Sequence, residues 1–513
     1  MSRGPLIAVL CAAVLIAGGS VAVLTGGGGG DEDEPPERVV KDPLGEALAY
    51  LPADARAVAV VQTGGEQAKA LSALLDKLIV GPVILRQLAG GLGLDVEEDV
   101  KPLLGHPLVL AAPQTPGLDL ASTLRQGGVA ALTAPSGKTL RETLAGAADA
   151  GRLARVEGAG DDVYTGARGT IAVAADGPVL VLARDAAGAR AAIERRARRT
   201  GLRADDHARR VAPVAPAAQP APLVTLTAPA QALVQLAGVG EIPNADALTD
   251  GAVAVRIGAK DVAIPFAAAA DEARFKPESL PIPLGPAAPS PAPGTAPFSL
   301  AIRDARQTLN VLRKEETRTN IAALRSIEEA LEELDEVSGP LKTFGRIDVD
   351  EALFDQLTGT TTITREANAT VVRAELNDGD PLRTALDRIA KVPQFAYELA
   401  GIDGVALDRE GDEAFVLKLE GEKPVRLAVL DKILVATTGP TVGLRAVAHR
   451  PAGRVDTEGA LHARLTRPGE LLVERFGLPG ATSVLLGGLG PLDVAVRAER
   501  TGLTGSATLT VAR

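Results

Sequence analysis

Acidic side chains are concentrated in one short stretch, LDVEEDVKPLLG, at residues 94–105. Asp95, Glu97, Glu98 and Asp99 lie within five positions of one another. Carboxylates at this density suit either a calcium ion or the positive end of a helix dipole. The stretch lacks the ligand spacing and the glycine of an EF-hand loop. Because Asp95 and Glu98 have the N-cap and N3 spacing of a capping box, we predict that they are structural helix caps.

A second copy of this pattern follows much later in the chain, as IDVDEALFDQLTG at residues 347–359. Asp348 and Glu351 repeat the spacing of the first pair, and we predict that they too are helix caps. The place of Asp99 is taken by Ala352. A calcium site would need that carboxylate, so the comparison favours a helix start over a metal site in both stretches.

Arginine dominates the stretch RAAIERRARRTGLRADDHARR, which has eight arginines between Arg190 and Arg210. Four of them, Arg195, Arg196, Arg198 and Arg199, are candidates for an anion-binding site. Guanidinium groups in such a cluster suit lipid headgroups or a polyanionic envelope polymer. The alternative is a solvated helix end whose arginine stems cover apolar surface.

The sequence lacks the motifs that usually identify catalytic and metal-binding sites. The chain has a single cysteine, Cys11, and its four histidines follow no zinc-binding spacing. No G-x-S-x-G, H-E-x-x-H or C-x-x-C pattern occurs outside the N-terminal segment. Gly-Lys-Thr at residues 137–139 lacks the earlier glycine of a phosphate loop and is interpreted as a turn that enters a helix. We predict no catalytic residues, no cofactor and no metal.

The composition narrows the classes of function further. The chain has 513 residues, 46% hydrophobic residues, no Trp, three Tyr and eight Phe, and a net charge of −11. An acidic balance disfavours general nucleic-acid binding. The scarcity of aromatic residues argues against a carbohydrate platform or a base-stacking surface.

The N-terminal segment predicts a location. Residues 5–24 contain no charge and would span about 30 Å as a helix, which matches one hydrocarbon core. Arg3 precedes the segment, so we expect residues 1–4 in the cytoplasm and the bulk of the chain on the far side of the plasma membrane. The alternative is secretion after cleavage of a signal peptide near residues 20–22. Glycine and acidic residues at 25–42 would form a flexible tether.

The remaining chain contains an approximate repeat. KTLRETL at residues 138–144 resembles DPLRTAL at 380–386, and further segments match in the same order at similar offsets. This pattern predicts an internal duplication, with one unit at residues 43–275 and a related unit at 298–513. The Pro-rich segment at 276–297 is expected to be an extended linker between them.

Each unit is predicted to be α+β. Closely spaced strand patterns, such as those at residues 170–174 and 179–183, need antiparallel pairing because a parallel crossover takes a dozen residues or more. Leucine and isoleucine recur at helical spacing at residues 66–80 and 317–337, which predicts two long helices. We therefore expect a largely antiparallel sheet in each unit, with helices packed on one face.

Two stretches resemble a known bacterial family. EALAYLPADARAVAVV at residues 46–61 and the acidic stretch with its following strand at 95–110 look like the family catalogued as domain of unknown function 3352. The resemblance implies a secreted or membrane-anchored envelope protein, and it implies no activity. The second unit departs from the motif, because it lacks Tyr-Leu-Pro-Ala-Asp and has Gln-Leu-Thr-Gly at residues 356–359.

These observations together predict a membrane-anchored extracytoplasmic protein that is not an enzyme. Its expected role is that of a binding or structural module of the cell envelope, and its expected partners are the membrane and an envelope protein or lipid, not nucleic acid. Two alternatives are a hydrolase that uses carboxylates on an envelope polymer and a carrier that holds lipid in an apolar cavity.

Overall fold

The fold was obtained as a computed structural model that describes most of the chain after residue 39. The described ranges are 40–70, 95–113, 120–157, 162–166, 171–216, 219–237, 245–276, 278, 280, 282–284, 296–313, 338–339, 341–343, 346–365, 369–392, 405–411, 413–419, 423–439, 443–449, 461–466, 468 and 489–511. The predicted membrane span, most of the tether, and most of the predicted helices at 66–80 and 317–337 lie outside these ranges. Among the described residues, no helix is long and apolar enough to cross a membrane.

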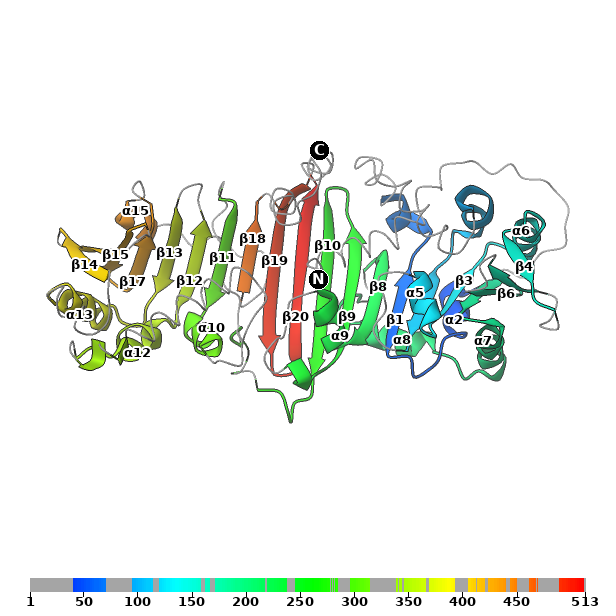
Figure 1. The fold of residues 1–513 in the computed structure, drawn as a ribbon, viewed down its shortest axis with the longest axis horizontal. Coiled ribbons are helices and arrows are strands. Elements are labelled where there is room, and N and C mark those ends of the chain that lie inside the picture. Colours follow the sequence, from blue (N-terminus) through cyan, green and yellow to red (C-terminus); the bar gives the residue numbers. More distant parts are fainter. Residues whose placement is uncertain are drawn as a thin grey trace.

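Twenty strands of the described residues form one sheet in which every pair of neighbouring strands is antiparallel (Figure 1). Half of the sheet comes from the strands before residue 271, in the spatial order β4 (Leu153–Arg155), β5 (Val163–Gly166), β6 (Ala172–Asp176), β7 (Val179–Ala183), β3 (Val129–Thr133), β2 (Leu108–Ala112), β1 (Ala57–Val61), β8 (Val224–Pro229), β9 (Leu248–Ile257), β10 (Asp261–Ala270).

The other half begins at the next strand and continues to the opposite edge. Its order is β20 (Gly502–Val511), β19 (Leu489–Glu499), β18 (Leu461–Leu465), β11 (Phe298–Arg303), β12 (Thr360–Arg365), β13 (Thr370–Glu375), β17 (Ile433–Thr437), β16 (Val425–Leu430), β15 (Ala414–Leu419), β14 (Val405–Glu410). The strands of the second half therefore follow the pairing order of the first half in reverse along the sheet.

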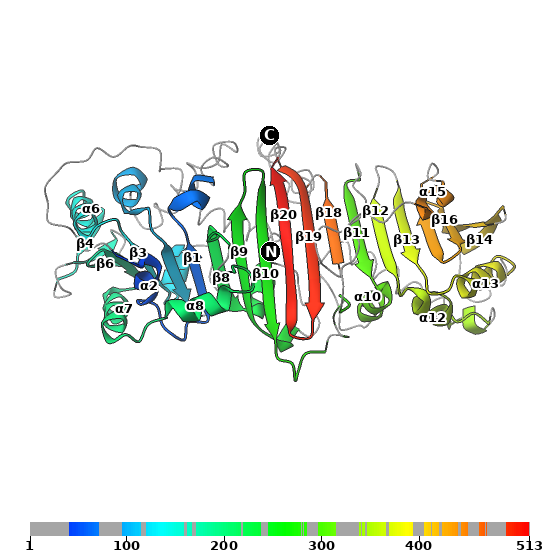
Figure 2. The ribbon, with the colours of Figure 1, turned by 180° about the vertical axis from the view of Figure 1, so that it is seen from behind.

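The two halves meet where β10 pairs with β20, at the centre of the molecule (Figures 1 and 2). Pro265 lies opposite Ser506 at the middle of this pair. Phe266 lies opposite Gly505, where a Cβ atom would come within 2.3 Å of the phenylalanine ring. The glycine thus leaves room for the aromatic ring across the strand. One unbroken ladder of backbone hydrogen bonds joins the halves.

Helices cover both faces of the sheet in the first half, which corrects the expectation of helices on one face. The helices α2 (Pro43–Leu48) and α7 (Ala186–Arg198) share a core cluster with Val58 and Val60 of β1. On the opposite face, α5 (Leu120–Arg125) and α6 (Gly137–Asp149) share a cluster with Ala59. The physical reason is visible in the strands, since β1, β3 and β7 are apolar at nearly every position and are buried along their whole length.

The second half is also covered on both faces. The helices α10 (Ala305–Leu312), α12 (Val349–Ala352) and α13 (Asp380–Ile389) pack with Phe354, Phe415 and Val429. The short helix α15 (Leu444–Ala448) packs with Val371 and Val435 in a separate cluster. Helices of both halves, including α8 (Ala204–Val211) and α9 (Ala230–Ala237), lie along one long side of the sheet (Figures 1 and 2).

Part of the predicted linker is packed against the junction of the halves. Leu280 is 1% exposed and shares a core cluster with Phe275 and Ala498. Leu284 forms an isolated parallel bridge with Ala498. The Pro-rich composition at 276–297 predicted an extended chain, but it gave no sign that leucines within the segment are anchored in the sheet.

Candidate functional site

The first acidic stretch forms a short π-helical turn, η1 (Val96–Val100). The Oδ1 atom of Asp95 accepts a hydrogen bond from the backbone N–H of Glu98 at 3.0 Å. The reciprocal bond differs from the one a capping box predicts, because the N–H of Asp95 donates to Oδ2 of Asp99 at 2.8 Å. Asp99, and not Glu98, therefore closes the turn.

The side chain of Asp99 is held by an arginine that is distant in sequence. Nη2 of Arg152 donates to Oδ1 of Asp99 at 2.8 Å, and Nε lies 2.7 Å from Oδ2. The same Nη2 donates to Glu98 at 2.9 Å. The Asp99 side chain is only 3% exposed, so its charge needs this partner. Arg152 follows the end of α6, and no spacing rule in the sequence connects it to the acidic stretch.

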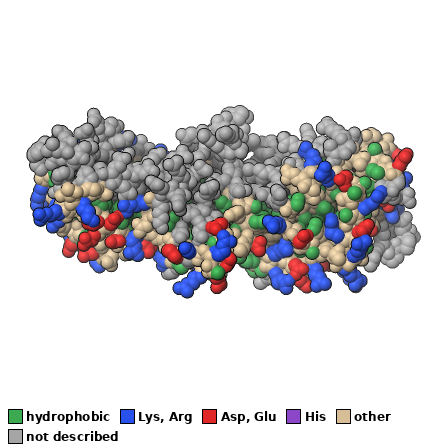
Figure 3. Space-filling view, turned by 60° about the horizontal axis from the view of Figure 1, so that its bottom comes forward, with side chains coloured by type: hydrophobic (Ala, Val, Ile, Leu, Met, Phe, Trp, Pro, Cys, Tyr) green, Lys and Arg blue, Asp and Glu red, His purple; other side chains and the backbone are tan. Residues whose placement is uncertain are grey.

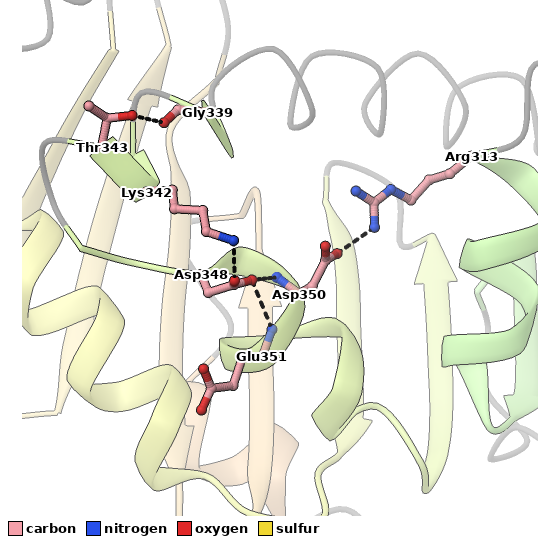
Figure 4. Close-up of polar contacts among 7 residues, drawn as sticks. All are labelled: Arg313, Gly339, Lys342, Thr343, Asp348, Asp350 and Glu351. Atoms are coloured by element: carbon pink, nitrogen blue, oxygen red, sulfur yellow. Dashed lines mark hydrogen bonds and ion pairs between the residues drawn. The ribbon is translucent and has the colours of Figure 1, made fainter.

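The second acidic stretch begins α12 and is more open (Figure 4). Oδ1 of Asp348 accepts the backbone N–H groups of Asp350 at 3.1 Å and Glu351 at 3.4 Å. Its Oδ2 accepts a hydrogen bond from Nζ of Lys342 at 2.7 Å, and this bond lowers the pKa of Asp348. The reciprocal bond of a capping box would run from the backbone N–H of Asp348 to the carboxylate of Glu351. The described residues do not form this bond.

The neighbouring carboxylate of Asp350 is also paired with a basic side chain of the protein, Arg313. Nη1 of Arg313 donates to Oδ1 of Asp350 at 2.6 Å (Figure 4). The same guanidinium lies 4.6 Å from the centre of the Phe354 ring, which is a favourable cation–π distance. Within the described residues, no group of three or more His, Cys, Asp or Glu side chains is placed to hold a metal ion.

The four arginines predicted to bind anions separate into two pairs. Arg195 donates from Nε to the carbonyl oxygen of Tyr50 at 3.1 Å, and burial lowers its pKa. Arg196 donates from Nε and Nη2 to Oε1 of Glu46 at 3.0 and 2.6 Å. This first pair joins the last turn of α7 to α2 and to the residues that follow it, and both guanidinium groups point toward the protein.

The second pair faces solvent. The side chain of Arg198 is 74% exposed and pairs with Glu194 one helical turn earlier. Arg199 is exposed and ends α7 in the left-handed conformation, with φ of 57°. Arg203, at the start of α8, is exposed as well. Of the predicted set of four, Arg198 and Arg199 are therefore exposed, and Arg203 extends this exposed surface to three residues.

The Tyr-Leu-Pro-Ala-Asp motif explains why α2 holds this position. Tyr50 is fully buried, and its hydroxyl donates to Oδ2 of Asp176 at 2.9 Å. Burial raises the pKa of Tyr50, so the phenol stays protonated as the donor. The backbone N–H of Leu202 donates to the carbonyl of Leu51 at 3.1 Å. These contacts fix the turn between α7 and α8 against the chain that follows α2.

Two adjoining cavities at the junction of the halves were not predicted from the sequence. The first, of about 500 Å³, is lined by three carboxylates, Glu272, Glu278 and Asp304, with Arg500 and Gln307. The second, of about 600 Å³, shares Glu278 and Gln307 with the first and follows the outer side of α10. Arg500 comes from a segment about 200 residues after the carboxylates, so no local motif could have revealed that it joins them in the first cavity.

Two histidines are buried in the sheet region. His207 on α8 is 4% exposed, and its Nε2 lies 3.4 Å from the hydroxyl of Thr225. Burial lowers the pKa of His207 to about 4. His462 on β18 is 6% exposed, and its Nε2 lies 3.5 Å from Oδ1 of Asp493.

Comparisons with known proteins identify no family. No protein-family description matches the sequence, and no curated protein matches it. Among solved structures, crystal form IV of TP0453 covers 46% of this chain and 81% of its own, with 11% identity and a TM-score of 0.24. Crystal form III of the same protein covers 47% and 81%, with 11% identity and a TM-score of 0.23. Similarity this low carries no argument about fold or function.

Proposed function

We propose that this chain is a single-pass membrane protein whose large extracytoplasmic part is a non-enzymatic binding or structural module of the cell envelope. The observation that carries the location is the uncharged segment at residues 5–24, with Arg3 before it and a glycine-rich, acidic tether after it. The motif resemblance to domain of unknown function 3352 points to the same compartment.

The contacts of the charged residues support a binding or structural role over catalysis. Asp95, Asp99 and Asp348 hold helix starts, and Arg152 and Arg196 hold helices together. Charged groups that are used in this way stabilise a scaffold.

The tandem arrangement of two related units is part of this proposal. It is supported by the strand order, because β1 lies between β2 and β8 just as β11 lies between β12 and β18. It is also supported by local contacts. Gly105 donates its N–H to Thr63 in the first half, and Gly359 accepts the N–H of Asp304 in the second.

Intact-mass measurement of the natively purified, full-length protein tests the location. We expect a mass that includes residues 1–24, together with resistance of the protein to extraction from membranes by alkaline carbonate. A mature mass that begins near Val23 would show cleavage and would overturn the anchor. Lipid that copurifies with the protein would appear in the same spectrum and would favour a lipid-carrier role.

A hydrolase is the second candidate, and the junction cavity favours it. Glu272, Glu278 and Asp304 line one space, and glycoside hydrolysis needs a pair of carboxylates on either side of the scissile bond. The test is incubation of the full-length protein with purified cell-wall polymer. Release of soluble fragments that is lost in Glu278→Gln and in Asp304→Asn would replace the non-enzymatic proposal. We expect no release.

A further inference from the structure

We infer that Arg198, Arg199 and Arg203 form a docking surface for anionic lipid headgroups, placed next to the point where the chain arrives from the membrane. This inference rests on the proposed membrane anchor and adds to it an orientation of the folded part. The surface is the exposed turn between α7 and α8. Figure 3 shows the side of the molecule on which these helices lie, where Lys and Arg side chains are interspersed with Asp and Glu.

The α7–α8 turn contacts the start of the folded chain. Glu46, which binds Arg196, lies one helical turn after Asp42, the N-cap of α2. The turn after α7 also approaches the chain after α2 very closely, because a Cβ atom on Gly201 would lie 1.8 Å from the carbonyl oxygen of Ala49. The turn with the exposed arginines is thus fixed at the C-terminal end of α2, one short helix away from Asp42, where the tether ends.

The segment that contains α7 and α8 is basic, although the whole chain is acidic. Residues 186–211 contain eight arginines and three carboxylates, which gives this segment a net charge of +5, whereas the whole chain has −11. Two of the arginines, Arg195 and Arg196, are directed inward by their bonds to the carbonyl of Tyr50 and to the carboxylate of Glu46. The exposed ones remain at the surface, and guanidinium groups bind phosphate with two parallel hydrogen bonds.

The tether predicted between the membrane span and α2 is short. Residues 25–41 separate the predicted span from Asp42, and a flexible chain of this length has an end-to-end distance of roughly 20–25 Å. The folded part is therefore kept near the bilayer, with the α7–α8 turn on the tethered side. Attraction to an anionic surface acts within about 10 Å, so basic residues at this end gain the most from it.

A competing occupant is the acidic run in the tether itself, Asp31 to Glu34. These carboxylates are close in sequence to α2 and could neutralise the same arginines. We favour lipid because guanidinium groups bind phosphate with two parallel hydrogen bonds, and phosphates are dense and continuous at a bilayer surface. The two occupants predict different responses to lipid composition, and the experiment separates them.

The test uses the full-length protein reconstituted into phosphatidylcholine vesicles with and without 30% phosphatidylglycerol. Arginine accessibility is measured as the rate of phenylglyoxal modification, resolved by peptide mass spectrometry. We expect modification of Arg198, Arg199 and Arg203 to slow by about fivefold or more in the anionic vesicles, and the effect to fade in high salt. The rate in vesicles of phosphatidylcholine alone is the reference against which this slowing is measured.

A matched pair of variants provides a second measurement, the distance from the α7–α8 turn to the bilayer by energy transfer. The first combines Arg198→Gln, Arg199→Asn and Arg203→Gln, with asparagine chosen because it tolerates the left-handed conformation. The control combines Lys391→Gln, Lys423→Gln and Lys432→Gln, which are exposed in the second half and remove the same charge. Only the arginine variant should move away from anionic vesicles.

The outcomes are distinguishable. Protein that is released from vesicles by alkaline carbonate would overturn the anchor, and with it the proposed function. Protein that stays inserted but whose arginines react equally in both lipids would overturn the docking surface alone. If replacing Asp31 to Glu34 by Asn and Gln speeds arginine modification in neutral vesicles, the tether is the occupant and the lipid inference is wrong.

Discussion

The two halves of the sheet share one order of strand pairing but differ in the side chains that this order brings together. In the first half, Val58 of β1 lies beside Ala111 and Thr227, and all three are buried. At the corresponding step of the second half, Ser299 of β11 is also buried but lies between two polar residues, Thr364 and Arg464. The ladder of backbone hydrogen bonds is therefore independent of whether the face above it is apolar or polar.

The same contrast applies to the helix starts. The carboxylate of Asp99 is buried against Arg152, whereas Asp348 pairs with Lys342, whose side chain is 70% exposed. At the helix start, the first half has the more buried charge, and the second half has left its charge closer to solvent. We therefore expect equivalent substitutions to cost more in the first half.

The largest effect is expected from a pair of core leucines on helices that the sequence aligns. Leu140 of α6 is 0% exposed, and Leu382 of α13 is 7% exposed. Leu140→Ala should cost about 4 kcal/mol of local stability and Leu382→Ala about 3 kcal/mol, since a tightly enclosed cavity relaxes least. Native-state hydrogen exchange in β3 and β13 measures both. A larger loss for Leu382→Ala would contradict the contrast between the halves.

Between pH 4 and pH 6.5, a pH effect is expected in the first half, at His207. The pKa of His207 is about 4 in the folded chain and about 6.5 in the unfolded chain, so the unfolded chain binds the proton more readily between these values. Stability is then complete above pH 6.5 and falls toward pH 4, by up to about 3 kcal/mol. In His207→Gln, the exchange protection of β8 should lose most of this pH dependence. An unchanged slope would show that other groups cause it.

Much of the fold class was accessible from the sequence because it depends on local patterns. The turn at Gly177, with φ of 62°, joins β6 and β7 where the alternating strands predicted a hairpin. The N-cap bond of Asp95 likewise follows from a three-residue spacing. Such features are decided by neighbours in the chain, and a single sequence records them.

Features that depend on distant partners were not accessible. Arg195 and Arg196 belonged to an apparently uniform basic run, and only the packing of α2 against α7 separates them from Arg198 and Arg199. The cavity carboxylates and the Asp99–Arg152 pair are likewise assembled by tertiary contacts. A run of charged residues in the sequence shows only that the segment is charged. Tertiary packing decides which of these side chains are exposed to solvent and can bind a partner.

A smaller effect is expected at the glycine that lets β1 approach the acidic stretch. A Cβ atom on Gly64 would lie 2.2 Å from the carbonyl oxygen of Gly105, which belongs to the backbone and cannot move alone. Gly64→Ala should therefore cost about 2 kcal/mol. The corresponding position in the second half is Ala305, at the start of α10. Ala305→Gly should cost about 1 kcal/mol or less, through helix propensity. Urea titration followed by hydrogen exchange compares the two, and equal costs would remove the steric distinction.

The smallest expected difference concerns the two ion pairs. Arg152→Gln leaves the carboxylate of Asp99, which is 3% exposed, without its charged partner, so the melting temperature of the first half should fall by a few degrees. Lys342→Gln removes a pair that is open to water, and the melting temperature should change by less than about one degree.

The double variant Asp99→Asn with Arg152→Gln separates the cost of the unpaired charge from the loss of packing. Because both charges are then absent, it should recover part of the stability lost in Arg152→Gln alone. Added salt provides the complementary comparison, since it should weaken the Lys342 pair and leave the buried pair nearly unchanged. If the two single variants melted alike at every salt concentration, the two helix starts would be energetically equivalent despite their different burial.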